Sequence, residues 1–311
     1  MRLAVIFTGG TIACTASGGY IGTSEKQNYE LLKVLDPDIE VKTFSPYFTL
    51  SEQLDGERLT ALVRCVGDRL GEGFDGIIIA HGTDTLQYSS AALALAFGDA
   101  QIPVVLVSSN YVLSDSRANG CVNFEHAVKF IREGIGGVYV SYRNTDSHPE
   151  IHRADRLLAH EPYSDDVRSL GGSFGYFDGD NFIHNDSSDF SNFSDVPDNQ
   201  QKTSETISFC KTSPVLWLNA HPGMIFPSTD GIRAVLFSGY HSGTLPTENA
   251  DFMRFCADCN KKQIPLYLVG MSAGNRYEST RVFEELNIRI LPEIAPIYAY
   301  VSLWAKFTET H

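Results

Sequence analysis

Short apolar segments alternate with amphipathic helical patterns through the first half of this chain, and that alternation restricts its fold more than any other feature. The apolar segments predict strands over 2–8, 39–44, 75–80, 103–108 and 137–142. The amphipathic patterns predict helices near 24–35, 55–71, 86–98 and 120–133, with helix starts at Ser51 and at Asn119-Gly120. Strands that alternate with helices are typical of an α/β fold, so we expect an open, mostly parallel sheet with helices on both faces.

The composition changes between residues 173 and 212, where Asp, Asn and Ser are frequent and phenylalanines are scattered. Such a segment cannot form a core of its own, although its phenylalanines suggest that it packs against one. We interpret 173–212 as a linker between a larger N-terminal domain, 1–172, and a smaller C-terminal α/β domain, 213–311. The smaller domain is predicted from strands at 215–218, 234–237 and 266–269 and from helices near 247–261 and 293–306.

The composition also excludes several classes of protein. The 311 residues carry 38 acidic and 24 basic side chains, a formal net charge of −14, which repels phosphate backbones and makes nucleic acid an unexpected partner. No apolar run approaches the roughly 18 residues of a membrane span. A strand begins directly after Met1-Arg2, which leaves no room for a signal peptide. We therefore expect a soluble, cytoplasmic protein.

The six cysteines do not follow a pattern typical of metal binding. Cys256-Ala-Asp-Cys259 is a single CxxC in a stretch with the pattern of an amphipathic helix, whereas a structural zinc site usually needs four ligands from paired clusters. We predict buried, reduced thiols at these positions, and neither metal binding nor redox use.

The first strand runs directly into the turn Thr8-Gly-Gly-Thr-Ile12. Gly9 and Gly10 allow a ligand to approach the backbone closely, and Thr11 presents a hydroxyl at the same place. The alternative is a tight turn with a capping threonine. A phosphate cradle is a second alternative, although the chain has neither the G-x-G-x-x-G nor the Walker pattern.

The third predicted strand runs into a similar turn, Ala80-His-Gly-Thr-Asp-Thr-Leu86. Thr83 is a second hydroxyl that either attacks a substrate or aligns a water, and Asp84 is an acceptor for a ligand ammonium or a hydroxyl proton. Asp84 is also a candidate cap for the helix that follows, and His81 is interpreted as structural. Open α/β sheets bind ligands outside the carboxyl ends of their strands, so we expect Thr11, Thr83 and Asp84 to converge on one pocket.

Two more segments carry side chains suited to a small-molecule site. Ser17-Gly-Gly-Tyr-Ile-Gly22 has the composition of a loop that opens and closes and carries the Tyr20 hydroxyl into the site. The alternative is an ordinary exposed loop. Thr49-Leu-Ser-Glu-Gln53 begins a predicted helix, where backbone amides and the Ser51 hydroxyl form a site for a carboxylate. The alternative for Ser51 is a simple N-cap.

Taken together and in this order, the motifs around Thr11, Tyr20, Ser51 and Thr83 resemble the bacterial L-asparaginase family, especially its cytoplasmic type. Further matching segments are Pro103-Val-Val-Leu106, Asn119-Gly-Cys-Val-Asn123, Ala220-His-Pro-Gly-Met224 and Gly239-Tyr-His-Ser-Gly-Thr-Leu-Pro246. The resemblance implies a two-domain α/β fold, a homodimer or homotetramer, and no metal or organic cofactor. It also implies hydrolysis of the side-chain amide of L-asparagine, or of a related small amide, to acid and ammonia.

The resemblance assigns roles to individual residues. Thr11 is the expected nucleophile that forms an acyl-enzyme, with Tyr20 beside it, and Thr83 belongs to a second catalytic group. Asp84 is expected to hold the α-ammonium of the substrate, and Ser51 its α-carboxylate. The substrate-binding candidates are Gly10, Ser51, Glu52, Gly82, Thr83 and Asp84.

The chain departs from the family at two places. Leu50 stands where the family usually has an aspartate just before the serine. The family also places a lysine after the fifth strand to pair with the second catalytic group, whereas residues 130–201 contain no lysine. If Arg153-Ala-Asp-Arg156 matches the family's Arg-x-x-Lys, Arg156 occupies the lysine position. His160 is the other candidate, and we expect both side chains on one face of a strand.

The missing lysine bears on activity. An arginine keeps the positive charge but, with a pKa above about 12, does not act as a base. If His160 acts as the base, activity should fall as the pH drops. Loss of one member of a proton-relay set typically lowers the rate by about 10²–10⁴-fold, so we expect either impaired hydrolysis or an inactive relative that binds aspartate, asparagine or a similar ligand. A third interpretation, the amide-donating subunit of a tRNA-dependent amidotransferase, is disfavoured by the acidic charge and by the lack of an extra N-terminal domain.

Overall fold

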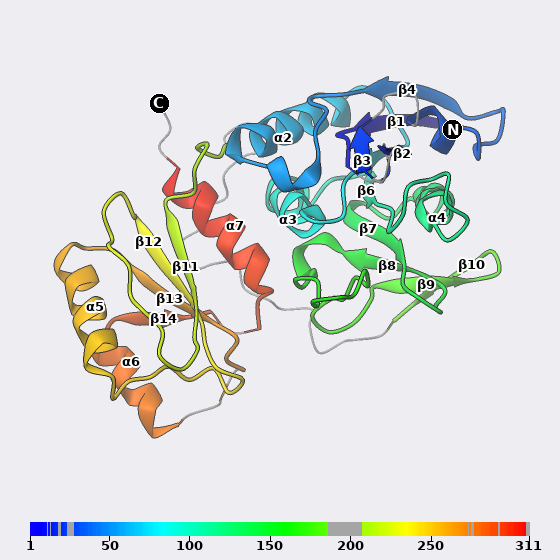
Figure 1. Ribbon diagram of the computed structural model, residues 1–311. Coiled ribbons are helices and arrows are strands. Elements are labelled where there is room, and N and C mark those ends of the chain that lie inside the picture. Colours follow the sequence, from blue (N-terminus) through cyan, green and yellow to red (C-terminus); the bar gives the residue numbers. More distant parts are fainter. Residues whose placement is uncertain are drawn as a thin grey trace. The chain divides into compact units, whose positions relative to one another are not determined.

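The computed structural model describes residues 1–10, 12, 14–17, 20–23, 28–185, 207–272, 274, 277–291 and 293–308 (Figure 1). These residues form two compact units, which comprise 1–185 with 207–208, and 209–308. The larger first unit and the smaller second unit each contain a sheet of their own, which agrees with the two-domain α/β fold expected from the sequence.

The first unit is built on an eight-stranded sheet in the order β10-β9-β8-β7-β6-β5-β1-β4. Its strands are β1 (Arg2–Phe7), β4 (Glu40–Phe44), β5 (Gly76–Ala80), β6 (Pro103–Val107), β7 (Gly137–Arg143), β8 (Pro149–Arg153), β9 (Gly175–Asp178) and β10 (Asn181–His184). The pairs from β4 to β7 are parallel, and the pairs from β7 to β10 are antiparallel. The expected mostly parallel sheet is confirmed, and it carries an antiparallel extension that the sequence patterns did not predict.

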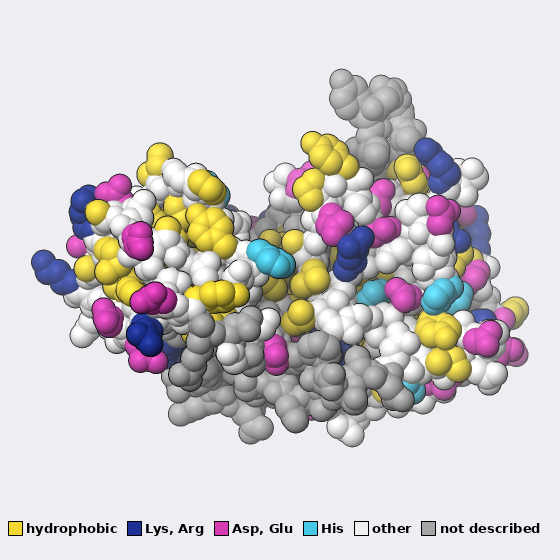
Figure 2. Space-filling model, turned by 90° about the horizontal axis from the view of Figure 1, so that it is seen from below, with side chains coloured by type: hydrophobic (Ala, Val, Ile, Leu, Met, Phe, Trp, Pro, Cys, Tyr) yellow, Lys and Arg dark blue, Asp and Glu magenta, His cyan; other side chains and the backbone are white. Residues whose placement is uncertain are grey.

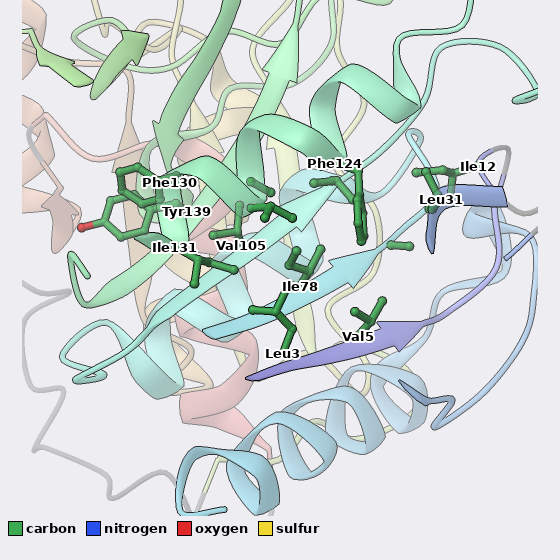
Figure 3. Packing of buried hydrophobic residues seen from close by; sticks show 14 of the residues in the cluster. Leu3, Val5, Ile12, Leu31, Ile78, Val105, Phe124, Phe130, Ile131 and Tyr139 are labelled. Carbon is green, nitrogen blue, oxygen red and sulfur yellow. The ribbon is translucent and has the colours of Figure 1, made fainter. Parts of the chain in front are cut away.

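Helices cover both faces of this sheet, as expected. They are α1 (Asn28–Leu32), α2 (Gly56–Leu70), α3 (Leu86–Phe97) and α4 (Gly120–Arg132). Figure 3 shows α4 on one side of the strands, where Phe124 and Ile131 approach the side chains of Val5, Ile78 and Val105. These side chains are buried and form one apolar core. On the other side of the strands, α2 packs against α3.

One predicted helix start is wrong. Ser51 opens only a short 3₁₀ turn, η3 (Ser51–Gln53), and the α-helix begins at Gly56. The Asp55 side chain accepts a hydrogen bond from the Arg58 N–H, so Asp55 is the N-cap of α2. The Ser51 hydroxyl is therefore not a helix cap and takes part in a different contact.

The predicted linker, 173–212, differs from the structure over its first part. β9 and β10 lie within it and pair with each other and with β8, so the first unit continues past the predicted boundary. The Phe182 and Phe174 rings pack against Phe130 of α4, with centroid distances of 5.1 and 6.3 Å. These aromatic contacts attach a polar segment to the core, as its phenylalanines suggested. Two further phenylalanines of the segment lie outside the described residues, Phe190 and Phe193.

The second unit contains a four-stranded parallel sheet in the order β11-β12-β13-β14. Its elements are β11 (Val215–Asn219), β12 (Ala234–Ser238), α5 (Ala250–Lys261), β13 (Leu266–Val269), η7 (Glu278–Thr280), α6 (Arg281–Glu285), β14 (Ile288–Ile290) and α7 (Pro296–Phe307). Cys256 and Cys259 on α5 are buried and unpaired, as predicted. Burial raises the pKa of the Cys256 thiol to about 12 and that of Cys259 to about 11, which keeps both thiols protonated.

Two surface properties bear on partners. No described helix is both long and apolar enough to cross a membrane. On the face shown in Figure 2, the described basic side chains are interspersed with acidic ones. The described part of this face therefore lacks the broad basic surface that a phosphate backbone needs.

Replacing Phe130 with alanine is expected to lower the free energy of unfolding of the first unit by about 3–5 kcal/mol. The ring is fully buried, and its centroid lies 4.7 Å from that of Tyr139, so its removal leaves a cavity beneath α4. Urea unfolding followed by far-UV circular dichroism measures the change. Lys129→Ala, at an exposed position of the same helix, is the control and should change the free energy by less than about 0.5 kcal/mol. Equal effects of the two substitutions would contradict this packing.

Candidate active site

The two glycine–threonine turns leave the sheet side by side. β1 and β5 are adjacent parallel strands, with Phe7 opposite Ala80 at their carboxyl ends. The Thr8 N–H and the Thr8 hydroxyl both donate to the Ala80 carbonyl, each at 3.1 Å. Gly9 pairs with Thr49 in a parallel bridge, which holds the segment after β4 against the first turn. The backbone of all three segments thus meets at one edge of the sheet.

The two turns touch through a pair of glycines. Gly10 has a φ of +78°, and a Cβ on it would collide with the backbone of Gly82. A Cβ on Gly82 would in turn collide with the Ser51 side chain. Only glycine fits at either position. The sequence predicted a close approach of a ligand to Gly10, and the structure shows a close approach of a second backbone segment. Thr83 follows Gly82 directly, whereas Thr11, which follows Gly10, lies outside the described residues.

The segment predicted to be a mobile loop has the backbone of a hairpin. β2 (Cys14–Ser17) pairs with β3 (Tyr20–Thr23) in antiparallel fashion, and Ser17 stands opposite Tyr20. The Tyr20 side chain, like Thr11, is outside the part of the chain that the structure describes. The catalytic roles of Thr11 and Tyr20 therefore stay predictions.

Ser51 and Asp84 are brought together by the contact between the turns. The Ser51 hydroxyl donates to Oδ2 of Asp84 at 3.1 Å, and the Thr85 hydroxyl donates to the Ser51 carbonyl at 2.9 Å. Ser51 is buried, whereas Asp84 and Glu52 are exposed. Ser51 therefore orients a carboxylate that remains accessible to a ligand. Asp84 does not cap the following helix, because the N-cap of α3 is Thr85.

The Thr83 hydroxyl is engaged by two buried serines at the end of β6. It donates its proton to the Ser109 carbonyl at 2.9 Å, so the Ser108 hydroxyl, 2.8 Å away, is the donor to Thr83 Oγ1. Asn123 of α4 fixes Ser108 by donating to its carbonyl at 2.8 Å. Neither serine was predicted as a site residue, although Ser108 ends the fourth predicted strand, Ser109 follows it, and both obey the same strand-end rule as Thr83.

His81 holds the second turn from the protein interior. Its Nδ1 lies 2.8 Å from the Gly82 carbonyl oxygen, and its Nε2 lies 2.8 Å from the Ser89 hydroxyl. A carbonyl only accepts, so Nδ1 carries the ring proton and Ser89 donates to Nε2. Burial lowers the pKa of His81 to about 4, so the ring is neutral at pH 7. These contacts agree with the structural role expected for His81.

The two candidates for the lysine position do not share a strand face, so that prediction is wrong. β8 ends at Arg153, the short helix η4 (Ala154–Arg156) follows, and the chain continues as a loop to His160. η4 packs beside α3. Arg156 is partly buried, and this burial, together with the Arg153 charge, lowers the pKa of its guanidinium.

His160 reaches the second turn. Its Nε2 lies 3.2 Å from the Thr83 carbonyl oxygen, and its Nδ1 lies 3.1 Å from the Asp166 carbonyl oxygen. His160 thus contacts the backbone of Thr83, while the Thr83 hydroxyl faces Ser108 and Ser109. No sequence pattern indicates this contact, which joins residues 77 positions apart.

The arrangement suits chemistry on a small zwitterionic ligand. Asp84 offers an acceptor for a cationic group and Ser51 offers a donor for an anionic group. The backbone N–H groups of the second turn suit an oxygen that gains negative charge. Within the described parts of the chain, no three His, Cys, Asp or Glu side chains form a group that could hold a metal ion.

Sequence comparisons find similarity to two kinds of protein. Residues 2–162 match the family model described as asparaginase, N-terminal. The chain is 33% identical over 145 residues to an L-asparaginase of Thermococcus kodakarensis, a match that covers 46% of this chain and 44% of that protein. It is 30% identical over 163 residues to a glutamyl-tRNA(Gln) amidotransferase subunit of Methanosarcina mazei, covering 50% and 38%. These matches span less than half the length of either relative.

Solved structures share the fold over almost the whole chain. The thermostable L-asparaginase from Thermococcus kodakarensis aligns with a TM-score of 0.72 at 20% identity, covering 100% of both chains. The L-asparaginase I from Vibrio cholerae aligns with a TM-score of 0.75 at 16% identity, covering 98% of this chain and 92% of that one. These structures show that the two-domain α/β fold is shared.

Adding a methyl group to either contacting glycine is expected to force the two turns apart. Gly10→Ala and Gly82→Ala should each lower the free energy of unfolding by about 2 kcal/mol or more, through overpacking and, at Gly10, backbone strain. Thermal unfolding measures the loss. Gly71→Ala is the matched control, because Gly71 has a helical φ of −92° and no atom near its would-be Cβ. A loss at Gly71 as large as that at Gly10 would contradict the contact.

The His81 contacts predict a loss of stability in acid. A histidine whose pKa is about 6.5 when unfolded and about 4 when folded binds more protons in the unfolded state, so stability falls as the pH drops from 6.5 toward 4. The full effect is on the order of 3 kcal/mol. In His81→Asn the amide replaces Nδ1 as donor and this loss is absent. Urea midpoints at pH 7 and pH 4.5 compare the two proteins, and the same decline in both would refute the assignment.

Proposed function

This chain belongs to the asparaginase family, and we propose on that basis that it hydrolyses the side-chain amide of L-asparagine, or of a related small amide, to the acid and ammonia. The backbone contact between Gly10 and Gly82 supports this most directly, since a threonine motif follows each of these glycines in the sequence. A threonine from each motif and the carboxylate of Asp84 are the groups that the reaction requires around one small substrate.

We assign the nucleophile to Thr11. The Thr83 hydroxyl donates to one carbonyl and accepts from Ser108, so Thr83 is better suited to positioning than to attack. In the proposed reaction, Thr11 Oγ1 adds to the amide carbon, its proton passes to the leaving nitrogen, and the C–N bond breaks to release ammonia. Water then cleaves the acyl ester and returns a proton to Thr11. Tyr20 assists these proton transfers from beside Thr11.

Substrate binding uses the exposed end of the Ser51–Asp84 contact. The substrate α-ammonium donates to Asp84, which frees the Ser51 hydroxyl to donate to the α-carboxylate. Gly10 and Gly82 allow the substrate to approach the backbone, and Glu52 lies at the exposed rim beside Ser51. The backbone N–H groups of the second turn stabilise the negative charge that develops on the amide oxygen.

The missing lysine limits the proposed rate. Arg156 retains a positive charge in the matching segment, but a guanidinium does not act as a base. Loss of one relay member typically lowers the rate by about 10²–10⁴-fold, so we propose a slow amidohydrolase. The absence of lysine from residues 130–201 also favours a second candidate function, an inactive relative that binds aspartate, asparagine or a similar ligand through Asp84 and Ser51.

The amide-donating subunit of a tRNA-dependent amidotransferase is a third candidate, favoured by the similarity to the Methanosarcina mazei protein. The net charge of −14 opposes binding of a polyanion, so we rank this function below amide hydrolysis. Filter binding of tRNA at low salt separates the two, because only an amidotransferase subunit needs to hold tRNA.

The proposal also covers the oligomeric state of the protein and its location in the cell. We expect a homodimer or homotetramer in the cytoplasm. One structural neighbour, from Campylobacter jejuni, is named a probable cytoplasmic L-asparaginase; it aligns with a TM-score of 0.72 at 19% identity over 99% of this chain and 95% of its own. Sedimentation equilibrium measures how many copies of the chain assemble.

Ammonia release from L-asparagine, L-glutamine and their D-enantiomers tests the proposed reaction. We expect measurable turnover of at least one of these amides, and we expect Thr11→Ala to reduce it to background while aspartate affinity, measured by calorimetry, changes less than about threefold. Thr60→Ala, on α2 and outside the proposed catalytic and binding residues, is the control and should leave both quantities unchanged.

Two outcomes would contradict this assignment in different ways. Wild-type protein that binds aspartate tightly but releases no ammonia supports the ligand-binding alternative. Turnover that survives in Thr11→Ala shows that a different group attacks the amide.

A further inference from the structure

Two histidines contact consecutive carbonyls of the second turn. His81 donates from Nδ1 to Gly82, and His160 lies with Nε2 at 3.2 Å from the Thr83 carbonyl oxygen. All described peptides are trans, and in a trans peptide the N–H of the next residue points away from the carbonyl. The Thr83 and Asp84 N–H groups therefore point away from the two histidines. Neither of these N–H groups donates to another described residue.

The two rings have different hydrogen-bond partners. Both nitrogens of His160 face carbonyl oxygens, those of Thr83 and Asp166. A neutral imidazole has one N–H, so it makes only one of these bonds and turns a lone pair toward the other oxygen. The imidazolium makes both. His81 differs, because Nε2 faces the Ser89 hydroxyl, which donates to it, and the neutral ring satisfies both contacts.

The loop that carries His160 is held against the sheet. Leu157 pairs with Ser169 in an antiparallel bridge at the base of the loop. The Tyr142 hydroxyl on β7 donates to the Asp165 carbonyl at 2.8 Å, and Asn144 donates to the Val167 carbonyl at 2.8 Å. The Asp166 carbonyl therefore has a fixed position, and His160 links it to the turn.

Several ionisable groups lie on the elements around His160, namely Glu161, Asp165, Asp166 and Arg168 in its own loop, Asp84 in the turn and Tyr142 on β7. Glu161 and Arg168 form an ion pair at 2.9 Å, and the Asp166 carboxylate accepts from the Thr145 N–H at 2.9 Å. Burial raises the pKa of Tyr142 to about 12, so it stays neutral. The Asp84 carboxylate accepts from Ser51.

We propose that the His160 imidazolium is a positioning residue, which braces the Thr83 carbonyl so that the Thr83 and Asp84 N–H groups are aimed at the oxygen of a bound substrate. The catalytic part of this inference rests on the amide hydrolysis proposed above. Loss of the ring proton removes one of the two bonds and loosens the turn. Activity then falls as the pH rises, whereas a histidine that acts as a base loses activity as the pH falls.

Three substitutions of His160 distinguish the hydrogen bond made by Nε2 from the one made by Nδ1. The Gln amide reaches where Nε2 stood, the Asn amide reaches where Nδ1 stood, and Ala reaches neither. We expect His160→Gln to keep kcat within about threefold and to abolish the decline at high pH. His160→Asn and His160→Ala should lower kcat by about 10–100-fold and change KM by less than about threefold. His148→Gln, between β7 and β8, is the control and should leave the profile unchanged.

Nuclear magnetic resonance tests the brace without relying on turnover. We expect ¹⁵N shifts of a doubly protonated His160 ring at low pH, and amide resonances of Thr83 and Asp84 that titrate together with that ring in wild type but not in His160→Gln. Three outcomes would overturn the inference: the amide resonances of Thr83 and Asp84 do not titrate with the His160 ring, His160→Gln and His160→Asn lower kcat equally, or activity falls only toward low pH. If the resonances titrate together but the protein shows no turnover, the proposed hydrolysis is refuted and the positioning role of His160 is still supported.

Discussion

The contact between Gly10 and Gly82 is the constraint on which the rest of the candidate site depends. Parallel pairing of β1 with β5 brings the two turns to the same edge of the sheet, but pairing alone leaves room for side chains between them. Because neither glycine has a Cβ atom, the two backbones come into direct contact, and the Ser51 side chain packs against Gly82. The Ser51–Asp84 hydrogen bond follows from this approach. The arrangement of the candidate site therefore depends on two residues that have no side chain.

Hydrogen-bond direction then separates groups that look equivalent in sequence. Thr83 gives its proton to a carbonyl, which makes Ser108 a donor and leaves the hydroxyl oriented by the end of β6. His81 and His160 hold neighbouring carbonyls of one turn, yet one faces a hydroxyl and the other faces a second carbonyl. Carbonyls cannot donate, so these partners, more than the residue types, decide where protons lie.

Local patterns predict the first unit well where strands are apolar and continuous. β1, β5 and β6 were predicted within about a residue of their ends because such runs, bounded by turns, have few other structures available. β9 and β10 were missed because each has only four residues in a segment rich in Asp, Asn and Ser. Phe182 of β10 is held by aromatic packing on Phe130. The helix start was placed at Ser51 although Asp55 is the cap.

The residues of the candidate site also differ in how far the sequence predicts them. Residues in strand-end turns, such as Thr83 and Asp84, were predicted because topology alone brings strand ends together. Ser108 obeys that rule too and was overlooked. The His160 contact could not be predicted from sequence, because it depends on the path of a loop 77 positions further along the chain.

The position of β1 in the sheet has a consequence for folding. β1 lies inside the sheet, between β4 and β5, although it precedes every other strand of this sheet in the sequence. Leu3 pairs with Val41 and Gly76, which lie 38 and 73 residues further along the chain. The nascent chain therefore carries an unpaired apolar strand until both partners have emerged, and this non-local order slows folding and increases the need for chaperones.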